Sequence, residues 1–103
     1  MKSYHVHILN SAMYDIKNIQ QYISDSSDSL DTALRQKNRI LSAINKLSVA
    51  PKIYRVRTKD AFHRDIRYLP VDNYFILYTV YDDEQQVDVL NVIHNKRDID
   101  SLI

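Results

Sequence analysis

The chain contains no glycine among its 103 residues, and this absence limits both its turns and its chemistry. Turns must be built by Asn, Asp, Ser and the two prolines, of which Asn and Asp best tolerate a left-handed backbone. A phosphate-binding P-loop and a dinucleotide-binding GxGxxG motif both need backbone without a Cβ atom. The sequence therefore argues against nucleotide cofactors bound in these ways, and we expect no cofactor.

Composition predicts a small globular protein. A mass of 12.2 kDa with 45% hydrophobic residues fits one domain over residues 1–103 with a single modest core. No apolar run is long enough to span a bilayer, and residues 1–10 lack the apolar stretch of a signal peptide. We therefore expect a cytoplasmic protein without membrane contact. There are no cysteines, which excludes disulfides and thiolate metal sites.

The four histidines are candidate metal ligands, but their spacing matches no common site. They are His5, His7, His63 and His94, and only the first two would share one strand face. Ordinary strand histidines are the favoured interpretation, so no metal site is predicted.

Hydrophobic periodicity predicts an early strand followed by a helix. Residues Tyr4–Leu9 alternate enough to form the strand. Asn10 or Ser11 can cap the helix by accepting hydrogen bonds from its free N–H groups. The apolar stripe of this helix has steps of four, three and four residues and consists of Ala12, Ile16, Ile19 and Ile23. The polar segment 24–29 is predicted to end it.

A second helix is predicted from about Leu30 to Ser48, after a cap at Asp28 or Ser29. Pro51 prevents its continuation. One side of this helix is basic and carries Arg35, Lys37, Arg39 and Lys46. Two amphipathic helices joined by a short link form a hairpin, whose apolar stripes need a sheet or the other helix to cover them.

The remainder of the chain is rich in strand-forming residues. The predicted strands are Ile53–Arg57 as a short edge segment, then Ile66–Val71, Tyr74–Tyr81 and Val87–His94. The pair Asp72-Asn73 predicts a tight turn, residues 82–86 a loop, and residues 97–103 a short terminal helix. The order strand, helix, helix, antiparallel meander predicts an α+β fold with the helices on one face of a small curved sheet.

Charge is unevenly distributed although the net charge is only +1. Residues 52–67 hold six cations against two Asp, whereas residues 72–88 hold five carboxylates and no Lys or Arg. The first block is either a phosphate-contacting patch or a solvated surface, and composition favours neither. Among the eight tyrosines, Tyr74 and Tyr78 are predicted to pack in the core, while Tyr68 and Tyr81 are better candidates for exposure and base stacking.

Four sequence patterns, in their order and spacing, cover nearly the whole chain. They are A-x-x-D-I-x-x-I-x-x-Y-I at 12–23, I-x-x-L-x-x-x-P at 44–51, R-x-L-P-V-x-N-Y-x-I-x-Y-x-V at 67–80 and V-x-V-L-x-V-x-H-x-x-R-D at 87–98. Together they resemble the RelE/ParE superfamily of bacterial toxins from type II toxin–antitoxin pairs. The resemblance implies a growth-arresting toxin of RelE-like fold that a cognate antitoxin neutralises.

In the RNA-cleaving members of this superfamily, the sheet face beside the last strand binds ribosome-held mRNA. By resemblance, His94 and Arg97 would be catalytic if the chain is a nuclease, without a metal, by activating the ribose 2′-OH and stabilising the phosphate. The predicted target-binding residues are Arg64, Arg67, Lys96, Arg97 and Tyr81. The simpler alternatives are a strand-end histidine bonded to a neighbouring loop for His94, and a local ion pair with Asp98 for Arg97.

Two features depart from the nuclease pattern. Phe75 stands where nuclease members often carry arginine, and the C-terminal catalytic tyrosine is missing. The H-x-x-R-D ending looks more like the ParE branch, whose studied members poison DNA gyrase. The resemblance therefore favours gyrase inhibition narrowly over mRNA cleavage on the ribosome, and a decayed toxin that still binds its antitoxin is a third possibility.

Overall fold

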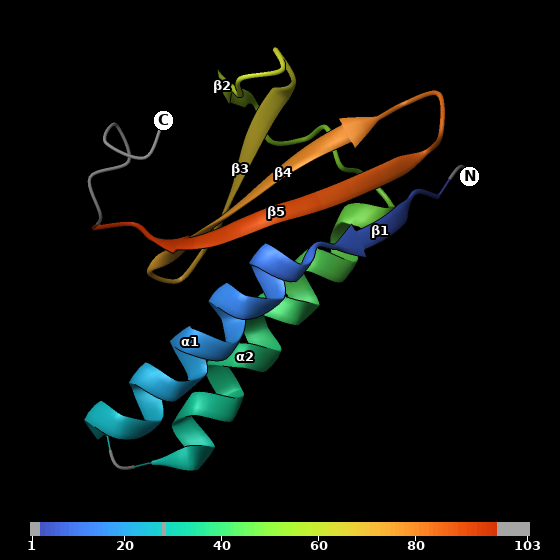
Figure 1. The fold of residues 1–103 in the computed structure, drawn as a ribbon. Helices are drawn as coiled ribbons and strands as arrows, with labels where there is room; N and C mark the ends of the chain where they lie inside the picture. The colour runs from blue at the N-terminus through green and yellow to red at the C-terminus, as the bar shows by residue number, and fades with distance from the viewer. Residues whose placement is uncertain (1–2, 28, 97–103) are drawn as a thin grey trace.

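The computed structural model describes residues 3–27 and 29–96. Its elements are β1 His5–Ile8, α1 Asn10–Ser27, α2 Leu30–Asn45, the 3₁₀ turn η1 Lys46–Ser48, β2 Val56–Lys59, β3 Asp65–Val71, β4 Tyr74–Tyr81 and β5 Gln86–His94. The sheet has the order β1-β5-β4-β3-β2, in which β1 runs parallel to β5 and the other pairs are antiparallel. The α1–α2 hairpin lies on one side of the sheet, and its loop end projects away from it (Figure 1). The predicted α+β fold is confirmed.

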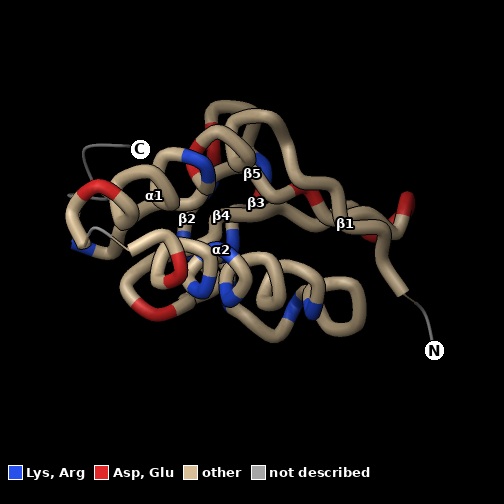
Figure 2. Tube along the Cα trace, turned by 90° about the horizontal axis from the view of Figure 1, so that it is seen from below, with Lys and Arg blue, Asp and Glu red and all other residues tan. Residues whose placement is uncertain are grey.

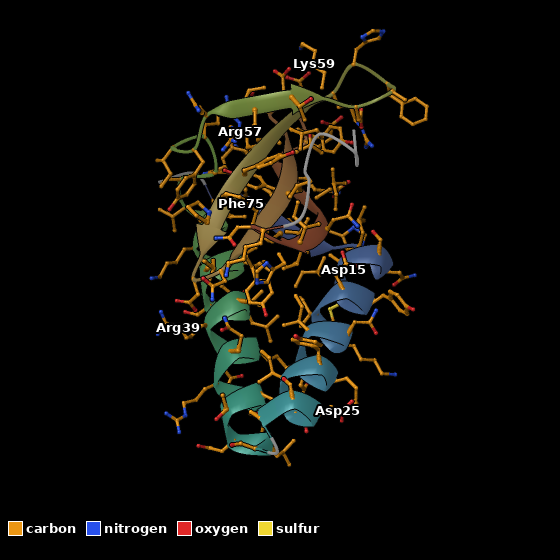
Figure 3. All side chains as sticks on the ribbon, turned by 90° about the vertical axis from the view of Figure 1, so that its left-hand side faces the viewer. Asp15, Asp25, Arg39, Arg57, Lys59 and Phe75 are labelled. Carbon is orange, nitrogen blue, oxygen red and sulfur yellow. The ribbon has the colours of Figure 1, made fainter. Side chains whose placement is uncertain are left out.

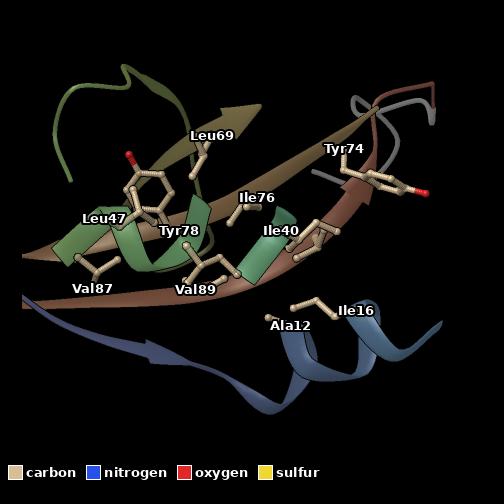
Figure 4. Packing of buried hydrophobic residues seen from close by; sticks show 12 residues of the cluster. Ala12, Ile16, Ile40, Leu47, Leu69, Tyr74, Ile76, Tyr78, Val87 and Val89 are labelled. Carbon is tan, nitrogen blue, oxygen red and sulfur yellow. The ribbon is translucent and has the colours of Figure 1, made fainter. Parts of the chain in front are cut away.

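The core lies between the helical hairpin and the sheet (Figure 4). Its largest buried side chain is Tyr78, which is 0% exposed. Tyr74 is also buried, so the prediction that these two tyrosines pack in the core is confirmed. The other members of the cluster are Ala12, Ile16, Ile40, Ile44, Leu47, Leu69, Ile76, Val87, Val89 and Val92. Burying this apolar area is the main favourable term in folding.

The helix ends differ from prediction at two points, one of which is the end of α2 at Asn45, since only the 3₁₀ turn η1 reaches the predicted end at Ser48. Ser29 is the cap of α2, as predicted, and its side chain accepts a hydrogen bond from Thr32 N at 3.2 Å. The predicted break at residue 24 is wrong, because α1 continues to Ser27. The Ser26 and Ser27 hydroxyls donate to the carbonyls four residues earlier, at 2.7 and 2.5 Å, so these polar side chains are satisfied within the helix.

The predicted edge strand at 53–57 is displaced, since β2 begins only at Val56. Two hydrogen bonds hold the preceding segment against the core instead. The Tyr78 hydroxyl donates to the Pro51 carbonyl at 2.5 Å, and Arg67 Nη1 donates to the Tyr54 carbonyl at 2.6 Å. The segment before β2 is therefore fixed by side chains of β3 and β4, and it lies outside the sheet.

The turn predicted at Asp72-Asn73 joins β3 to β4. Asp72 has a φ of 54°, and its carboxylate accepts two hydrogen bonds from Arg39, both 2.7 Å, and one from Gln36 at 3.0 Å. Hydrogen bonds from Arg39 and then Gln36 hold the pKa of Asp72 below its ordinary value. The turn is thus tied to α2, which fixes one end of the sheet against the helices.

No helix within the described parts of the chain has both the length and the apolarity needed to cross a membrane.

The buried hydrogen bond of Tyr78 gives a stability prediction. Tyr78→Phe is expected to lower the free energy of unfolding by about 1 kcal/mol, because the Pro51 carbonyl loses its donor. Burial raises the pKa of Tyr78 to about 12, above the value near 10 of an unfolded tyrosine. The stabilisation is therefore complete below about pH 10 and is lost as the pH rises toward about 12.

Urea unfolding of both proteins at about pH 8 and about pH 11 measures this effect. The wild-type chain should lose more stability than Tyr78→Phe between these two conditions. Equal losses would show that the hydroxyl is not protected in the folded state.

Candidate functional site

The sheet face opposite the helices, called the distal face below, combines aromatic rings with the cations Arg57 and Arg64. On β4 its residues alternate with the core residues, so Phe75 and Tyr81 point to the distal face. The Arg57 guanidinium of β2 lies 4.9 Å from the centre of the Tyr68 ring and 5.8 Å from that of Phe75 (Figure 3). The predicted exposure of Tyr68 is wrong, since it is 4% exposed beneath Arg57 and beside Phe75.

Arg64 and Tyr81 meet at one end of this face. Arg64 Nη1 donates to the Tyr81 hydroxyl at 2.8 Å, and Arg64 Nε donates to Asp60 Oδ2 at 2.6 Å. Desolvation acts to raise the pKa of Asp60, but hydrogen bonds from the Arg64 backbone and side chain and the Phe62 N–H lower it below its ordinary value. The structure therefore brings two predicted target-binding residues together, with the Arg64 cation already paired.

Arg67 lies on the opposite face of the sheet. It is paired with the core residue Tyr78 across the β3–β4 ladder, and its guanidinium donates to the carbonyls of Lys52 at 3.3 Å and Tyr54 at 2.6 Å. These contacts fix the segment before β2. Arg67 is thus an anchor of the fold on the helix side and does not join Arg64.

His94 and Lys96 lie at the other end of β5, beside a groove that α1 borders. His94 packs edge-on against Tyr74, with ring centres 5.3 Å apart, and its Nδ1 accepts a hydrogen bond from Lys96 N at 3.0 Å. In the neutral ring the proton is therefore on Nε2. Tyr14, Asn18 and Tyr22 of α1 also line the groove. This geometry matches the simpler interpretation of His94 as a strand-end histidine held by its neighbours.

The predicted residues do not form one cluster in the part of the chain that the structure describes. His94 pairs with Tyr74 and Gln86 pairs with Tyr81, at the two ends of the β4–β5 ladder. Seven strand steps separate these ends, a distance of about 23 Å. Arg97, the other predicted catalytic residue, lies outside the described residues, as does the predicted helix at 97–103.

Half of the six cations in the basic block at 52–67 are paired with carboxylates. Lys52 pairs with Asp82 at 2.6 Å, Lys59 with Asp65 at 2.5 Å, and Arg64 with Asp60 at 2.6 Å. Arg67 is bonded to carbonyls on the helix side, and Arg57 lies over rings on the distal face. Lys and Arg also gather along α2 (Figure 2). The unpaired cations of the block thus lie on different faces of the sheet and do not form one phosphate-binding patch.

Sequence reasoning did not single out Arg57, Asp60 or Phe62. The i, i+4 spacing of Asp60 and Arg64 was the available signal for a closed loop, but their contact depends on a turn that the sequence alone does not specify. Among the described residues there is no group of three or more His, Asp and Glu side chains arranged to hold a metal ion.

Solved structures of low sequence identity share this fold. They include the chromosomal ParDE system from Pseudomonas aeruginosa, with a TM-score of 0.74 and 13% identity over 91% of this chain and 98% of that chain. The RelE–RelB complex from Pyrococcus horikoshii has a TM-score of 0.64 and 14% identity over 92% and 98%. The RelBE2 complex from Mycobacterium tuberculosis has a TM-score of 0.61 and 19% identity over 91% and 93%. The fold is therefore that of the RelE/ParE toxins.

The sequence itself matches one family within that class. Residues 6–99 match the family described as the ParE toxin of the type II toxin–antitoxin system, parDE. The match covers most of the chain, so this protein belongs to the ParE toxin family, and the resemblance inferred from the four sequence patterns is confirmed. Comparison with curated protein sequences gives no match.

The contacts of Arg67 predict a structural role. Arg67→Ala is expected to lower the free energy of unfolding by about 1.5–3 kcal/mol, because two carbonyls lose a charged donor. Arg55→Ala is the matched control, since Arg55 is exposed in the same block, and it should change stability by less than about 0.5 kcal/mol. Urea unfolding of the three proteins measures both. Equal effects of the two substitutions would refute the anchoring role.

Proposed function

We propose that this toxin arrests growth by binding and inhibiting DNA gyrase, without catalysis of its own. The observation that carries the proposal is the match of residues 6–99 to the ParE toxin family. RNA cleavage needs a general acid–base and a cation at the same reacting phosphate. Among the described cations predicted to bind the target, Arg64 lies at the opposite end of the β4–β5 ladder from His94 and is paired with Asp60. This separation leaves Arg64 too far away to act beside His94.

We further propose that a cognate antitoxin neutralises the toxin. Three similar structures are described as toxin–antitoxin systems or complexes, which supports such a partner for this chain. The basic side of α2 offers complementary charge to an acidic antitoxin segment at the exposed Lys46, whereas Arg35 is already paired with Asp31 of the same helix.

One observation favours a second candidate, mRNA cleavage on the ribosome. Nuclease members often carry an arginine at the position of Phe75, and the Arg57 guanidinium lies 5.8 Å from the centre of that ring. Arg57 of β2 thus places a cation close to the position where β4 of this chain has Phe75 in place of an arginine. The experiments below therefore include RNA.

The primary test is a supercoiling assay with purified chain, purified gyrase, relaxed plasmid and ATP. The chain is expected to block supercoiling in proportion to its concentration, and addition of antitoxin should restore it. In cells, induction should arrest growth while the 5′ ends of transcripts stay unchanged. New 5′ ends at set positions within codons, lost in Arg97→Ala, would establish the nuclease instead.

His94→Gln separates the two functions independently of Arg97. If His94 supplied acid–base catalysis, its loss would slow RNA cleavage by about 100-fold or more and relieve growth arrest. Under the gyrase proposal, growth arrest by this variant should equal that of the wild-type chain. The measurement is the culture growth rate after induction, with immunoblotting to confirm equal amounts of toxin.

A further inference from the structure

The loop between β2 and β3 carries the most exposed large apolar side chain of the described residues. Phe62 is 80% exposed. The loop lies at the end of the molecule away from the helical hairpin (Figure 1), and Lys59, which directly precedes it, is at the opposite end from Asp25 of α1 (Figure 3). An apolar ring this exposed contributes little to the core, so it is free to contact a partner outside the chain.

The loop is held in one conformation. The Asp60 carboxylate accepts hydrogen bonds from Phe62 N at 2.9 Å, Arg64 N at 3.0 Å and Arg64 Nε at 2.6 Å. Two backbone bonds close the loop, from Asp60 N to the Arg64 carbonyl at 3.1 Å and from His63 N to the Asp60 carbonyl at 3.0 Å. A preorganised loop loses little conformational entropy when it binds. Phe62 is therefore presented in the manner of a binding anchor.

Arg64 fixes the loop to the sheet and to the ring. Its Nη1 is bonded to the Tyr81 hydroxyl at 2.8 Å, and its guanidinium carbon lies 5.6 Å from the centre of the Phe62 ring. Phenylalanine and arginine are both enriched at the cores of protein interfaces.

The charges around Phe62 favour a protein over a nucleic acid as the partner. The two cations and two carboxylates of residues 59–65 pair with each other, Lys59 with Asp65 and Arg64 with Asp60. A nucleic acid backbone would gain little from this surface, because binding to phosphates depends on unpaired cations. A neutral surface with a protruding ring instead fits an apolar pocket on a protein.

We propose that Phe62 is the anchor of this toxin and inserts into an apolar pocket on its protein target. The inference deepens the proposed function and rests on it only in requiring that the target be a protein. Asp60 and Arg64 are positioning residues that hold the ring outward. The groove at His94 has no part in this contact, since it borders α1.

The test compares Phe62→Ala with Phe62→Leu in the gyrase assay and in growth arrest. Phe62→Ala is expected to raise the half-inhibitory concentration by about tenfold or more, and Phe62→Leu, which retains apolar volume, by about threefold or less. Leu30→Ala is the matched control, because Leu30 is 61% exposed at the start of α2, and it should leave inhibition unchanged. Thermal unfolding should be alike for all variants, since Phe62 is exposed.

Failure of the Phe62 anchor and failure of the proposed gyrase inhibition give different results in these assays. If Phe62→Ala inhibits gyrase as strongly as the wild-type chain does, the anchor role of Phe62 is overturned and the proposed function stays intact. Equal loss of inhibition in the Leu and Ala variants would show that an aromatic face is required, and would overturn an anchor that depends on apolar volume alone. A third outcome is growth arrest without inhibition of gyrase, in which Phe62→Ala weakens the arrest more than Phe62→Leu does. It would reject gyrase as the target and support Phe62 as the anchor on another protein.

Discussion

The hydrogen bonds along the outer edge of β5 are the constraint on which the rest of the structure depends. β1 pairs in parallel with the first half of this strand, from Gln86 to Val89. Beyond Val89, side chains of α1 bond the backbone groups of β5 that have no partner strand. The Ser11 hydroxyl donates to the Leu90 carbonyl at 2.6 Å, and the Asp15 carboxylate accepts from Val92 N at 3.0 Å. Residues 77 and 79 positions apart are thereby joined. A strand edge that would otherwise expose free backbone groups is covered, and the helical hairpin is confined to one side of the sheet.

That confinement determines which surfaces are left for a partner. The helix side of the sheet is filled by the core, and its cation Arg67 is used to hold the chain before β2. The distal face holds its cations over rings or beside carboxylates, as Arg57 and Arg64 show. Charge in this molecule therefore serves mainly to join neighbouring segments. If the target is a protein, as proposed, the shape and apolar contacts of the surface would carry most of the binding.

The sequence was sufficient for the elements and the fold class, and insufficient for the site. Strong periodicity located both helices and the strands β4 and β5, and the Asp72 turn followed from local chemistry. The site required knowledge of which face each side chain points to and what it meets across the sheet. Arg64 and Arg67 are three positions apart, so the alternation of β3 sends them to opposite faces. Tyr68 becomes buried because Arg57, from another strand, lies over it. Such pairings depend on register, which no single segment specifies.

The absence of glycine, which limited the predicted turns, also explains their rigidity. Three described residues that are not glycine adopt a positive φ, His63 at 61°, Asp72 at 54° and Gln85 at 50°. Each costs on the order of 1 kcal/mol, because the Cβ atom crowds the backbone. Each also lies in a turn closed by a hydrogen bond, from His63 N to the Asp60 carbonyl, from Gln85 N to the Asp82 carbonyl, and from Arg39 to the Asp72 carboxylate. The strained backbone persists because these specific bonds hold it. The loop that carries Phe62 is one of these turns, so the bonds that offset its strain, with those of the Asp60 carboxylate, also keep the exposed ring in place.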